Sequence, residues 1–294
     1  MKVVLIGAGG YIGRHLQQGL VHRGHEVLAL TSSRPGGIDA KSGLLSANAI
    51  SVPDIDVVVH LAQSPWSSGK ENPAHVLAVN VLSAVQAAQA GVNVGAKRFI
   101  YASTGNVYQP SFSPLCEHDT LTTDNWYSLS KVQAEQALKQ FQDSIDIHLL
   151  RLFGVYGPTQ NARLVPNLIQ RVAASEAVTL MPGNNDKSGA IGGLRLSLSY
   201  INDVVAAFIH VLEHGGPQVM NVATGKAVSI REIVMAVAGA LDVSPHFEEL
   251  SHKRVGDLVA DTQLFQSVFA QPTTGFSDGL RATVQSFVEH QNAR

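Results

Sequence analysis

The chain has 294 residues, of which 45% are hydrophobic and 15% charged, enough apolar material for one large α/β domain or a large domain with a smaller partner. Its 21 basic and 23 acidic residues give a net charge of −2, so no nucleic-acid partner is expected. Cys116 is the only cysteine, which excludes intrachain disulfides and suits a reducing compartment. The apolar run that starts at Val3 is too short for a signal peptide or membrane span, so a cytoplasmic protein is expected.

The first half of the chain alternates short β-branched runs with amphipathic helical patterns. The predicted strands are Val3–Ile6, Glu26–Leu30, Val57–His60, Arg98–Ala102 and Ile147–Arg151, and the predicted helices are Tyr11–Arg23, Pro73–Ala90 and Tyr127–Phe141. Apolar strands that alternate with helices predict an α/β fold with a Rossmann-type doubly wound parallel sheet. The Gly- and Ser-rich segment between Leu30 and Val57 predicts an abbreviated strand and an irregular connection.

The pattern changes after Arg151. We expect helices at Leu164–Ala174, Asp203–Glu213, Ile230–Leu241 and Asp278–Glu289, and a Gly- and Asn-rich loop at Pro182–Gly193. No repeat or polar linker separates the two halves. The sequence therefore predicts a Rossmann domain over residues 1–155, with some later segments returning to it, and a smaller C-terminal α/β lobe over residues 156–294.

A glycine-rich turn follows the first predicted strand directly and opens a helix. It reads Gly7-Ala8-Gly9-Gly10-Tyr11-Ile12-Gly13. Glycines permit a tight turn and a close approach of the backbone to a pyrophosphate, and the helix N-terminus favours the phosphate charge. The strand before and the helix after give the motif its required context, so we expect Gly7, Gly9, Gly10, Tyr11, Ile12 and Gly13 to bind a dinucleotide.

The end of the second predicted strand bears on the choice of cofactor. An Asp or Glu at this position usually holds the ribose 2′-OH of NAD, whereas this chain has Thr31-Ser32-Ser33-Arg34. Hydroxyls and a guanidinium suit a 2′-phosphate, so NADP is favoured over NAD. Arg14, just after the last glycine, could assist; the alternative is that both arginines are solvated.

Tyr127 and Lys131 lie four residues apart at the start of a predicted helix. They therefore share one helix face, and the cation would stabilise the phenolate form of a tyrosine that moves protons. Such a pair alone is usually a helix surface, but Ser103-Thr104, with Val107-Tyr108 behind them, add hydroxyl groups after the strand at Arg98–Ala102.

Taken together, these motifs resemble the extended short-chain dehydrogenase/reductase family of NAD(P)-dependent nucleotide-sugar epimerases, dehydratases and ketoreductases. The resemblance covers nearly the whole chain and rests on the glycine turn, His60-Leu61-Ala62, Asn80-Val81, Tyr101–Tyr108, Tyr127 with Lys131, Arg151–Pro158, Tyr200–Val204 and Asn221–Gly225.

The resemblance implies a role for individual residues. Tyr127 would be the general acid/base, Lys131 would bind the nicotinamide ribose, and Thr104, with Ser103 as the fallback, would bond the reacting oxygen. Leu61 and Ala62, beside His60, would line the cofactor, and Asn80 would support the active-site backbone. His60 and Asn80 also have purely structural interpretations: His60 as a buried histidine with its hydrogen bonds made, and Asn80 as a polar residue in a helical turn.

The departures from the family narrow the reaction. Relatives that are 4,6-dehydratases carry an Asp-Glu pair after the catalytic Thr, where this chain has Gly105-Asn106, so a 4,6-dehydratase is disfavoured. A 4-ketoreductase or an epimerase of a nucleotide-activated sugar remains, and the Thr31–Arg34 segment favours the NADPH-dependent reductase. The expected substrate-binding residues are Arg254, Asn161 and Arg163; Arg195 is one position from the family arginine.

Two alternatives remain open: reduction of a non-sugar carbonyl compound, and a non-catalytic dinucleotide-binding protein. The twelve histidines form no ligand cluster typical of a metal site, so no metal is expected, and Cys116 is interpreted as incidental. Pro73–Ala90 and Tyr127–Phe141 correspond to the helices that form a dimer contact in relatives, which makes a homodimer a possible assembly.

Overall fold

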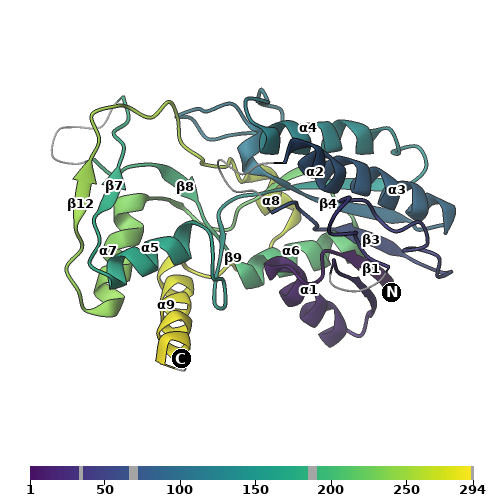
Figure 1. Cartoon of the computed structure of the whole chain (residues 1–294), viewed down its shortest axis with the longest axis horizontal. Coiled ribbons are helices and arrows are strands. Elements are labelled where there is room, and N and C mark those ends of the chain that lie inside the picture. The colour runs from purple at the N-terminus through teal and green to yellow at the C-terminus, as the bar shows by residue number, and fades with distance from the viewer. Residues whose placement is uncertain (33–35, 66–71, 185–190, 293–294) are drawn as a thin grey trace. The chain divides into compact units, whose positions relative to one another are not determined.

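The computed structural model describes residues 1–32, 36–65, 72–184 and 191–292 (Figure 1). The chain divides into two compact units. Unit 1 comprises Met1–Gln109, Glu117–Leu152 and Val205–Met220, and unit 2 comprises Pro110–Cys116, Phe153–Val204 and Asn221–Arg294.

Unit 1 is built on a six-stranded sheet. Its strand order is β10-β5-β4-β3-β1-β2. The strands are β1 (Lys2–Ile6), β2 (Glu26–Leu30), β3 (Val57–His60), β4 (Arg98–Thr104), β5 (Asp146–Leu152) and β10 (Val219–Val222). β1 pairs in parallel with both β2 and β3, β3 with β4, and β4 with β5. The order reverses beside β1, as in a Rossmann sheet.

Helices cover both faces of this sheet (Figure 1). On one face lie α2 (Pro73–Leu77), the π-helical turn η1 (Ala78–Leu82), α3 (Ser83–Asn93) and α4 (Trp126–Lys139). Small residues of α3, Ala84, Ala87 and Ala88, are fully buried against the strands, so this helix packs closely on the sheet. Because both faces are covered, the strands are mainly apolar, and the predicted α/β Rossmann class is confirmed.

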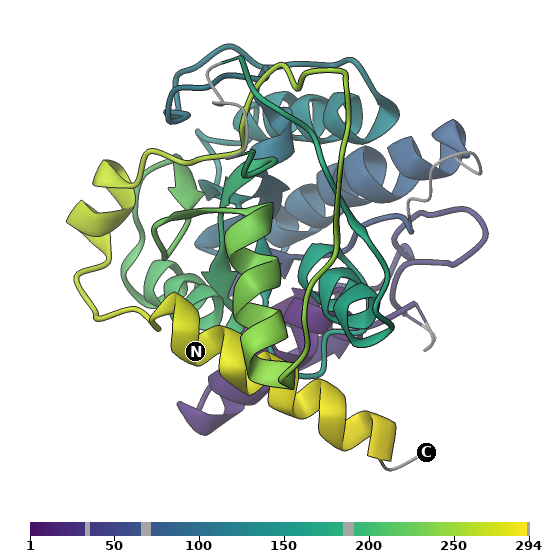
Figure 2. The same ribbon diagram turned by 90° about the vertical axis from the view of Figure 1, so that its left-hand side faces the viewer.

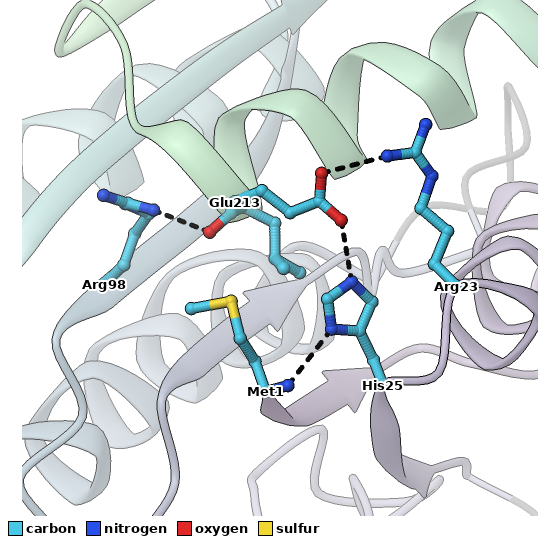
Figure 3. A network of polar contacts seen from close by, with 6 residues as sticks. Met1, Arg23, His25, Arg98 and Glu213 are labelled. Carbon is cyan, nitrogen blue, oxygen red and sulfur yellow. Dashed lines mark hydrogen bonds and ion pairs between the residues drawn. The ribbon is translucent and has the colours of Figure 1, made fainter.

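The other face carries α1 (Tyr11–His22) and α6 (Ile201–His214). A Cβ at Gly19 of α1 would lie 2.9 Å from Val205 of α6, so the glycine sets how closely the two helices pack. In the last turn of α6, Glu213 accepts hydrogen bonds at 3.0 Å from Arg23 and from His25, which follow α1, and Leu212 accepts a hydrogen bond at its carbonyl from Arg98 of β4 (Figure 3). These bonds fix the later helix on the sheet.

The apolar helical run Pro73–Asn93 has the length and mean hydropathy, 1.3 over 18 residues, of a membrane span. Half of that window is buried, and α3 within the run contacts β3, β4 and α4. Packing on the sheet therefore accounts for its apolar character.

Three differences from the sequence prediction concern unit 1. The abbreviated strand expected between Leu30 and Val57 is wrong for the described residues of that segment, which form only the isolated bridge Ile38–Leu45. The irregular connection is confirmed. The predicted helix Pro73–Ala90 contains a π-helical turn and extends to Asn93, and the edge strand β10 was not predicted.

The described residues of unit 2 form three small two-stranded sheets and most of the later helices. Parallel pairs join β6 (Val155–Tyr156) to β9 (Ser199–Tyr200) and β7 (Val178–Leu180) to β12 (Phe247–Glu249), and β8 (Arg195–Ser197) runs antiparallel to β11 (Ala227–Ser229). Its helices are α5 (Leu164–Ala173), α7 (Ile230–Leu241), α8 (Gln263–Val268) and α9 (Phe276–Asn292). Both α5 and α9 contact α7, and α9 crosses its end (Figure 2).

Candidate functional site

The glycine turn after β1 is fixed by hydrogen bonds to the neighbouring strand, β2. The amides of Gly7 and Ala8 both donate to the carbonyl of Leu30 at the end of β2, at 3.0 and 3.2 Å. Gly7 has a φ of +86°, which favours glycine, and a Cβ at Gly13 would lie 2.2 Å from the carbonyl oxygen of Gly7. The first hydrogen bond of α1 runs from Arg14 N to Gly10 O, so the amides of Ile12 and Gly13 in the first turn of α1 have no acceptor within the helix.

Residues after β3 meet this turn. A Cβ at Gly7 would lie 2.7 Å from the amide nitrogen of Ala62 and 3.0 Å from the carbonyl carbon of Leu61. The structure therefore brings the glycine turn together with Leu61 and Ala62 at the carboxyl ends of β1 and β3, where the strand order reverses. In open α/β sheets this crevice is where ligands bind.

The segment Thr31–Arg34, which is predicted to select the cofactor, lies only partly within the described residues. Thr31 lies beside the turn, with its Cγ2 3.5 Å from a Cβ built at Gly9, and Ser32 follows it; Ser33 and Arg34 lie outside the described residues. Asp39 is the next carboxylate along the chain, and its Oδ1 accepts bonds from the backbone and hydroxyl of Ser42. The guanidinium of Arg14 donates to the carbonyl of Gly9 at 2.8 Å.

Tyr127 and Lys131 occupy the first turns of α4. The side chain of Asn125 caps this helix by accepting the amide of Ser128. The Tyr127 hydroxyl donates to Oε1 of Gln63 at 3.3 Å, and the Lys131 ammonium donates to the carbonyl of Ala102 on β4 at 2.7 Å. α4 thus brings the phenol and the ammonium to the carboxyl end of the sheet, and Gln63 is a neighbour of the phenol that the sequence did not identify.

Lys131 is deeply buried, with 2% of its surface exposed. Its ammonium lies 4.6 Å from the centre of the Tyr101 ring, a cation–π contact. Burial lowers the pKa of Lys131 to about 7, although the carboxylate of Glu135 acts in the opposite direction. The lysine therefore titrates within the working range of most enzymes.

His60, at the end of β3, is a buried neutral histidine. Burial, with the charge of Lys131 as a second cause, lowers its pKa to about 3. Its Nε2 lies 2.8 Å from the hydroxyl of Ser83, and that hydroxyl donates to the carbonyl of Val79. Nε2 is therefore the donor, and Nδ1 is a buried atom without a hydrogen-bond partner.

Asn80 lies in the π-helical turn η1 and links three segments. Its Oδ1 accepts the amide of Ser64 at 3.0 Å, its Nδ2 donates to the hydroxyl of Ser130 on α4 at 2.9 Å, and its carbonyl accepts the hydroxyl of Tyr101 at 3.0 Å. π-helical turns are frequent at functional sites because they release backbone groups for other contacts. Here the turn connects the segment after β3 to the helix that carries Tyr127.

Ser103 and Thr104, at the end of β4, have different partners. The hydroxyl of Thr104 accepts the amide of Asn106 at 3.2 Å and starts the 3₁₀ turn η2 (Gly105–Val107). The hydroxyl of Ser103 donates to Glu135 of α4. Ser103 is thus bonded to a buried carboxylate, while the hydroxyl hydrogen of Thr104 is not needed for the turn.

A buried ion pair lies behind the lysine. Arg151 of β5 donates from Nε and Nη2 to the two carboxylate oxygens of Glu135, at 3.0 and 2.7 Å, and from Nη1 to the hydroxyl of Tyr108. Both ionic side chains are at most 2% exposed. The spacing from Lys131 to Glu135, four residues on the same helix, was a signal that the sequence analysis did not use.

The three predicted substrate-binding residues belong to unit 2 and have different surroundings. Arg254 is 8% exposed and donates to Asp257 Oδ1 at 2.8 Å and to the carbonyl of Met181 at 3.1 Å. Its guanidinium lies against Gly183, where a Cβ would come within 2.8 Å. Asn161 and Arg163 are exposed in the segment before α5, and Arg163 has a φ of 97°.

Comparison with known proteins adds to this geometry. The pattern of the NAD dependent epimerase/dehydratase family matches residues 3–223. UDP-glucose 4-epimerase of Mycolicibacterium smegmatis is 27% identical over 98% of both chains, and dTDP-4-dehydro-6-deoxy-D-allose reductase of Streptomyces bikiniensis is 28% identical over 81% of both. Among solved structures, MoeE5 in complex with UDP-glucose and NAD superimposes with a TM-score of 0.81, at 26% identity, over 99% of this chain and 100% of that one.

The Rossmann sheet, the glycine turn and the matched family define the class: the chain is a nicotinamide-dinucleotide oxidoreductase of the short-chain dehydrogenase/reductase type, and the relatives it matches carry the names of nucleotide-sugar enzymes. Within that class, it belongs to the NAD dependent epimerase/dehydratase family.

Proposed function

We propose that this enzyme interconverts an alcohol and a ketone at C4 of a nucleotide-activated hexose, with Tyr127 as the general acid/base. The observation that carries the proposal is the placement of Tyr127 and Lys131 on one face of α4, where the ammonium is buried and the phenol bonds to Gln63 at the carboxyl end of the sheet. Both an epimerase, which restores its cofactor, and a net ketoreductase use this step.

Each residue of the site has its own role in the proposed hydride and proton transfer. The nicotinamide cofactor, when bound, accepts or supplies the hydride. Tyr127 takes the hydroxyl proton as the C4–H bond breaks and returns a proton to the oxygen in the reverse direction. The positive charge of Lys131 stabilises the phenolate between these events. Thr104, whose hydroxyl hydrogen is available, is proposed to bond the reacting oxygen.

A 4,6-dehydratase is disfavoured by the turn that follows Thr104. The positions where an extra acid and base would stand are Gly105 and Asn106 in the turn η2, and neither can exchange a proton near neutral pH. The backbone of Asn106 is also used locally, since its carbonyl accepts the hydroxyl of Ser128 at 2.8 Å.

The glycine turn that follows β1 fits the pyrophosphate of a dinucleotide cofactor. At Gly7 and Gly13 a Cβ would come within 2.7 Å of backbone atoms, so the chain is compact there, and the first turn of α1 would offer its backbone amides to the phosphates. Leu61 and Ala62 would line the nicotinamide half, and Lys131 would bond its ribose.

We propose NADP(H) as the preferred form. No carboxylate stands at Thr31 or Ser32, and Asp39 is engaged by Ser42. The relative MoeE5 was solved with NAD, so the two dinucleotides should be compared directly by calorimetry. We expect NADP⁺ to bind more tightly and Arg34→Ala to weaken NADP⁺ binding while NAD⁺ binding changes little; tighter NAD⁺ binding by the unaltered protein would reverse the assignment.

The substrate side of the proposal rests on Arg254. A buried guanidinium that is oriented by Asp257 suits the diphosphate of a sugar nucleotide, because arginine binds phosphate oxygens in a fixed geometry. The matched relatives carry the names of enzymes of UDP- and dTDP-sugars, which is consistent with this assignment. Asn161 and Arg163 are proposed as further substrate contacts.

The test follows absorbance at 340 nm with NADPH or NADH and 4-keto sugar nucleotides, and, separately, conversion of UDP-glucose without net cofactor change. Tyr127→Phe should lower turnover by about 10²–10⁴-fold and leave dinucleotide binding intact. Reduction would indicate a ketoreductase, and redox-neutral conversion an epimerase. Unchanged turnover in Tyr127→Phe would refute the assignment. Turnover of non-sugar ketones alone, or dinucleotide binding without turnover, would favour the two alternative functions.

Two further properties are proposed with this function. A cytoplasmic location fits the single cysteine and a nucleotide-sugar substrate.

A homodimer through the helices α2–α3 and α4 fits the exposed apolar side chains Leu82 and Trp126, 51% and 44% exposed. Light scattering on the purified protein, with Leu82→Glu as the disrupting variant, tests the dimer.

A further inference from the structure

α4 carries a third ionisable residue on the face of Tyr127 and Lys131. Glu135 lies one turn beyond Lys131, and its side chain is 1% exposed. We propose that Glu135 is a positioning residue for the proposed reaction: its buried carboxylate, fixed by Arg151 and Ser103, favours the charged form of Lys131 behind the phenol of Tyr127. This inference rests on the function proposed above.

The carboxylate of Glu135 has a fixed place. Arg151 of β5 binds both of its oxygens, and Ser103 of β4 donates to one of them. Arg151 is itself anchored by two further acceptors, the hydroxyl of Tyr108 at 2.8 Å and the carbonyl of Glu117 at 2.9 Å. A buried charge with its geometry fixed from two strands is pre-organised to act on a neighbouring group.

The surroundings of Lys131 make a counter-ion necessary. The ammonium contacts the Ala102 carbonyl and the Tyr101 ring, which are dipolar groups without charge. The ionisable groups that interact with it are Glu135 from α4, His60 from β3 and Tyr101 from β4; Tyr127 shares its face of α4, and Arg151 from β5 pairs with Glu135. His60 is neutral, and burial together with the charges of Tyr127 and Glu135 raises the pKa of Tyr101 well above its usual value.

Glu135 is therefore the neighbouring carboxylate on α4, and it acts against the lowering of the Lys131 pKa by burial. Without it, the pocket would hold the lysine and Arg151 as two buried cations. The carboxylate acts through Lys131 and makes no contact with the reacting atoms, which separates its role from that of Tyr127.

The experiment observes the lysine directly. In protein labelled with ¹⁵N-lysine, the Nζ resonance of Lys131 is assigned by its loss in Lys131→Met, and its titration midpoint is measured by NMR. Glu135→Gln should lower the midpoint by about one pH unit or more. Glu135→Asp should recover part of this shift. Glu213→Gln, which removes a carboxylate of unit 1 at the far end of α6, is the matched control and should leave the midpoint unchanged (Figure 3).

A second variant guards against loss of folding. Glu135→Gln leaves Arg151 buried without its partner, so Glu135→Gln combined with Arg151→Met removes both charges, and this double variant should also lower the midpoint. An unchanged midpoint in either folded variant would overturn the inference.

Activity gives a separate readout. Once the assay with sugar nucleotides has identified a substrate, kcat is measured against pH. The alkaline limb of this profile should move to lower pH in Glu135→Gln, while KM for the sugar nucleotide changes little. If no nucleotide sugar is turned over by the unaltered enzyme, the proposed function fails, and the NMR titration still decides the role of Glu135.

Discussion

At the scale of single residues, Lys131 shows a conflict between function and stability. The unfolded chain keeps this lysine protonated up to its ordinary pKa of 10.5, whereas burial lowers the pKa to about 7 in the folded protein. The unfolded state therefore binds more protons between these pH values, and stability rises with pH across this window. Below pH 7 the full cost of burying the charge is present.

Lys131→Met should consequently stabilise the protein while it removes activity. We expect an increase in the free energy of unfolding of roughly 1–4 kcal/mol near pH 6–7, which declines towards zero by about pH 10.5. Urea unfolding at pH 6.5 and at pH 9.5 measures the difference. A destabilised Lys131→Met at pH 6.5 would mean that the ammonium contributes more through its bonds than its burial costs.

At the scale of elements, the glycine turn and α7 offer a matched pair of substitutions. Gly13→Ala places a Cβ 2.2 Å from Gly7 O and 2.8 Å from Ala8 Cα, which are backbone atoms that cannot move aside cheaply. Gly239 of α7 is helical, and a Cβ there meets nothing within 4 Å. The same chemical change should thus have opposite effects at the two sites.

Gly13→Ala should lower stability by roughly 1–3 kcal/mol and weaken dinucleotide binding. Gly239→Ala should raise stability by about 0.5–1 kcal/mol, since alanine loses less backbone entropy in a helix, and leave binding unchanged. Thermal unfolding and a dinucleotide titration of both variants provide the comparison. Equal effects of the two substitutions would show that the turn tolerates a side chain.

Elements with a strong local signal were predicted closely. β2, β3 and α7 have the predicted bounds, because short apolar runs and the capping box of Ser229 and Glu232 act within a few residues. The π-helical turn was missed because it depends on the bonds of Asn80 to other segments. The strands of unit 2 escaped prediction because each has only two or three residues, too few to show a period.

The candidate site divides in the same way. Tyr127, Lys131 and the glycines were found from the spacing within short motifs, whereas the role of Thr104 is implied by the family resemblance; all of these roles remain proposals. Arg151 belongs to one of the motifs of the resemblance, but its partner Glu135 lies 16 residues away along the chain and is brought close by the pairing of β5 with β4 beside α4. Gln63 meets Tyr127 across 64 residues, which no local pattern reveals.

At the scale of the whole molecule, the buried bases determine how stability depends on pH. His60 has an ordinary pKa of 6.5 in the unfolded chain and about 3 in the folded protein. Between these values the unfolded state binds the extra proton, so stability falls as the pH falls from 6.5 towards 3. The lowered pKa of Asp146, which His148 and Arg98 help to hold down, adds to this loss only at more acidic pH.

His60→Gln separates this contribution from the others, because the amide nitrogen can still donate to Ser83 and does not titrate. Between pH 6 and pH 5 the unaltered protein should lose up to about 1.4 kcal/mol per pH unit through this one group, a loss that His60→Gln should not show. Urea unfolding of both proteins at several pH values measures the two slopes. Gly239→Ala, which changes stability without removing a titrating group, should keep the slope of the unaltered protein. If His60→Gln retained that slope, the acid sensitivity would arise elsewhere, and His60 would not be buried in its neutral form.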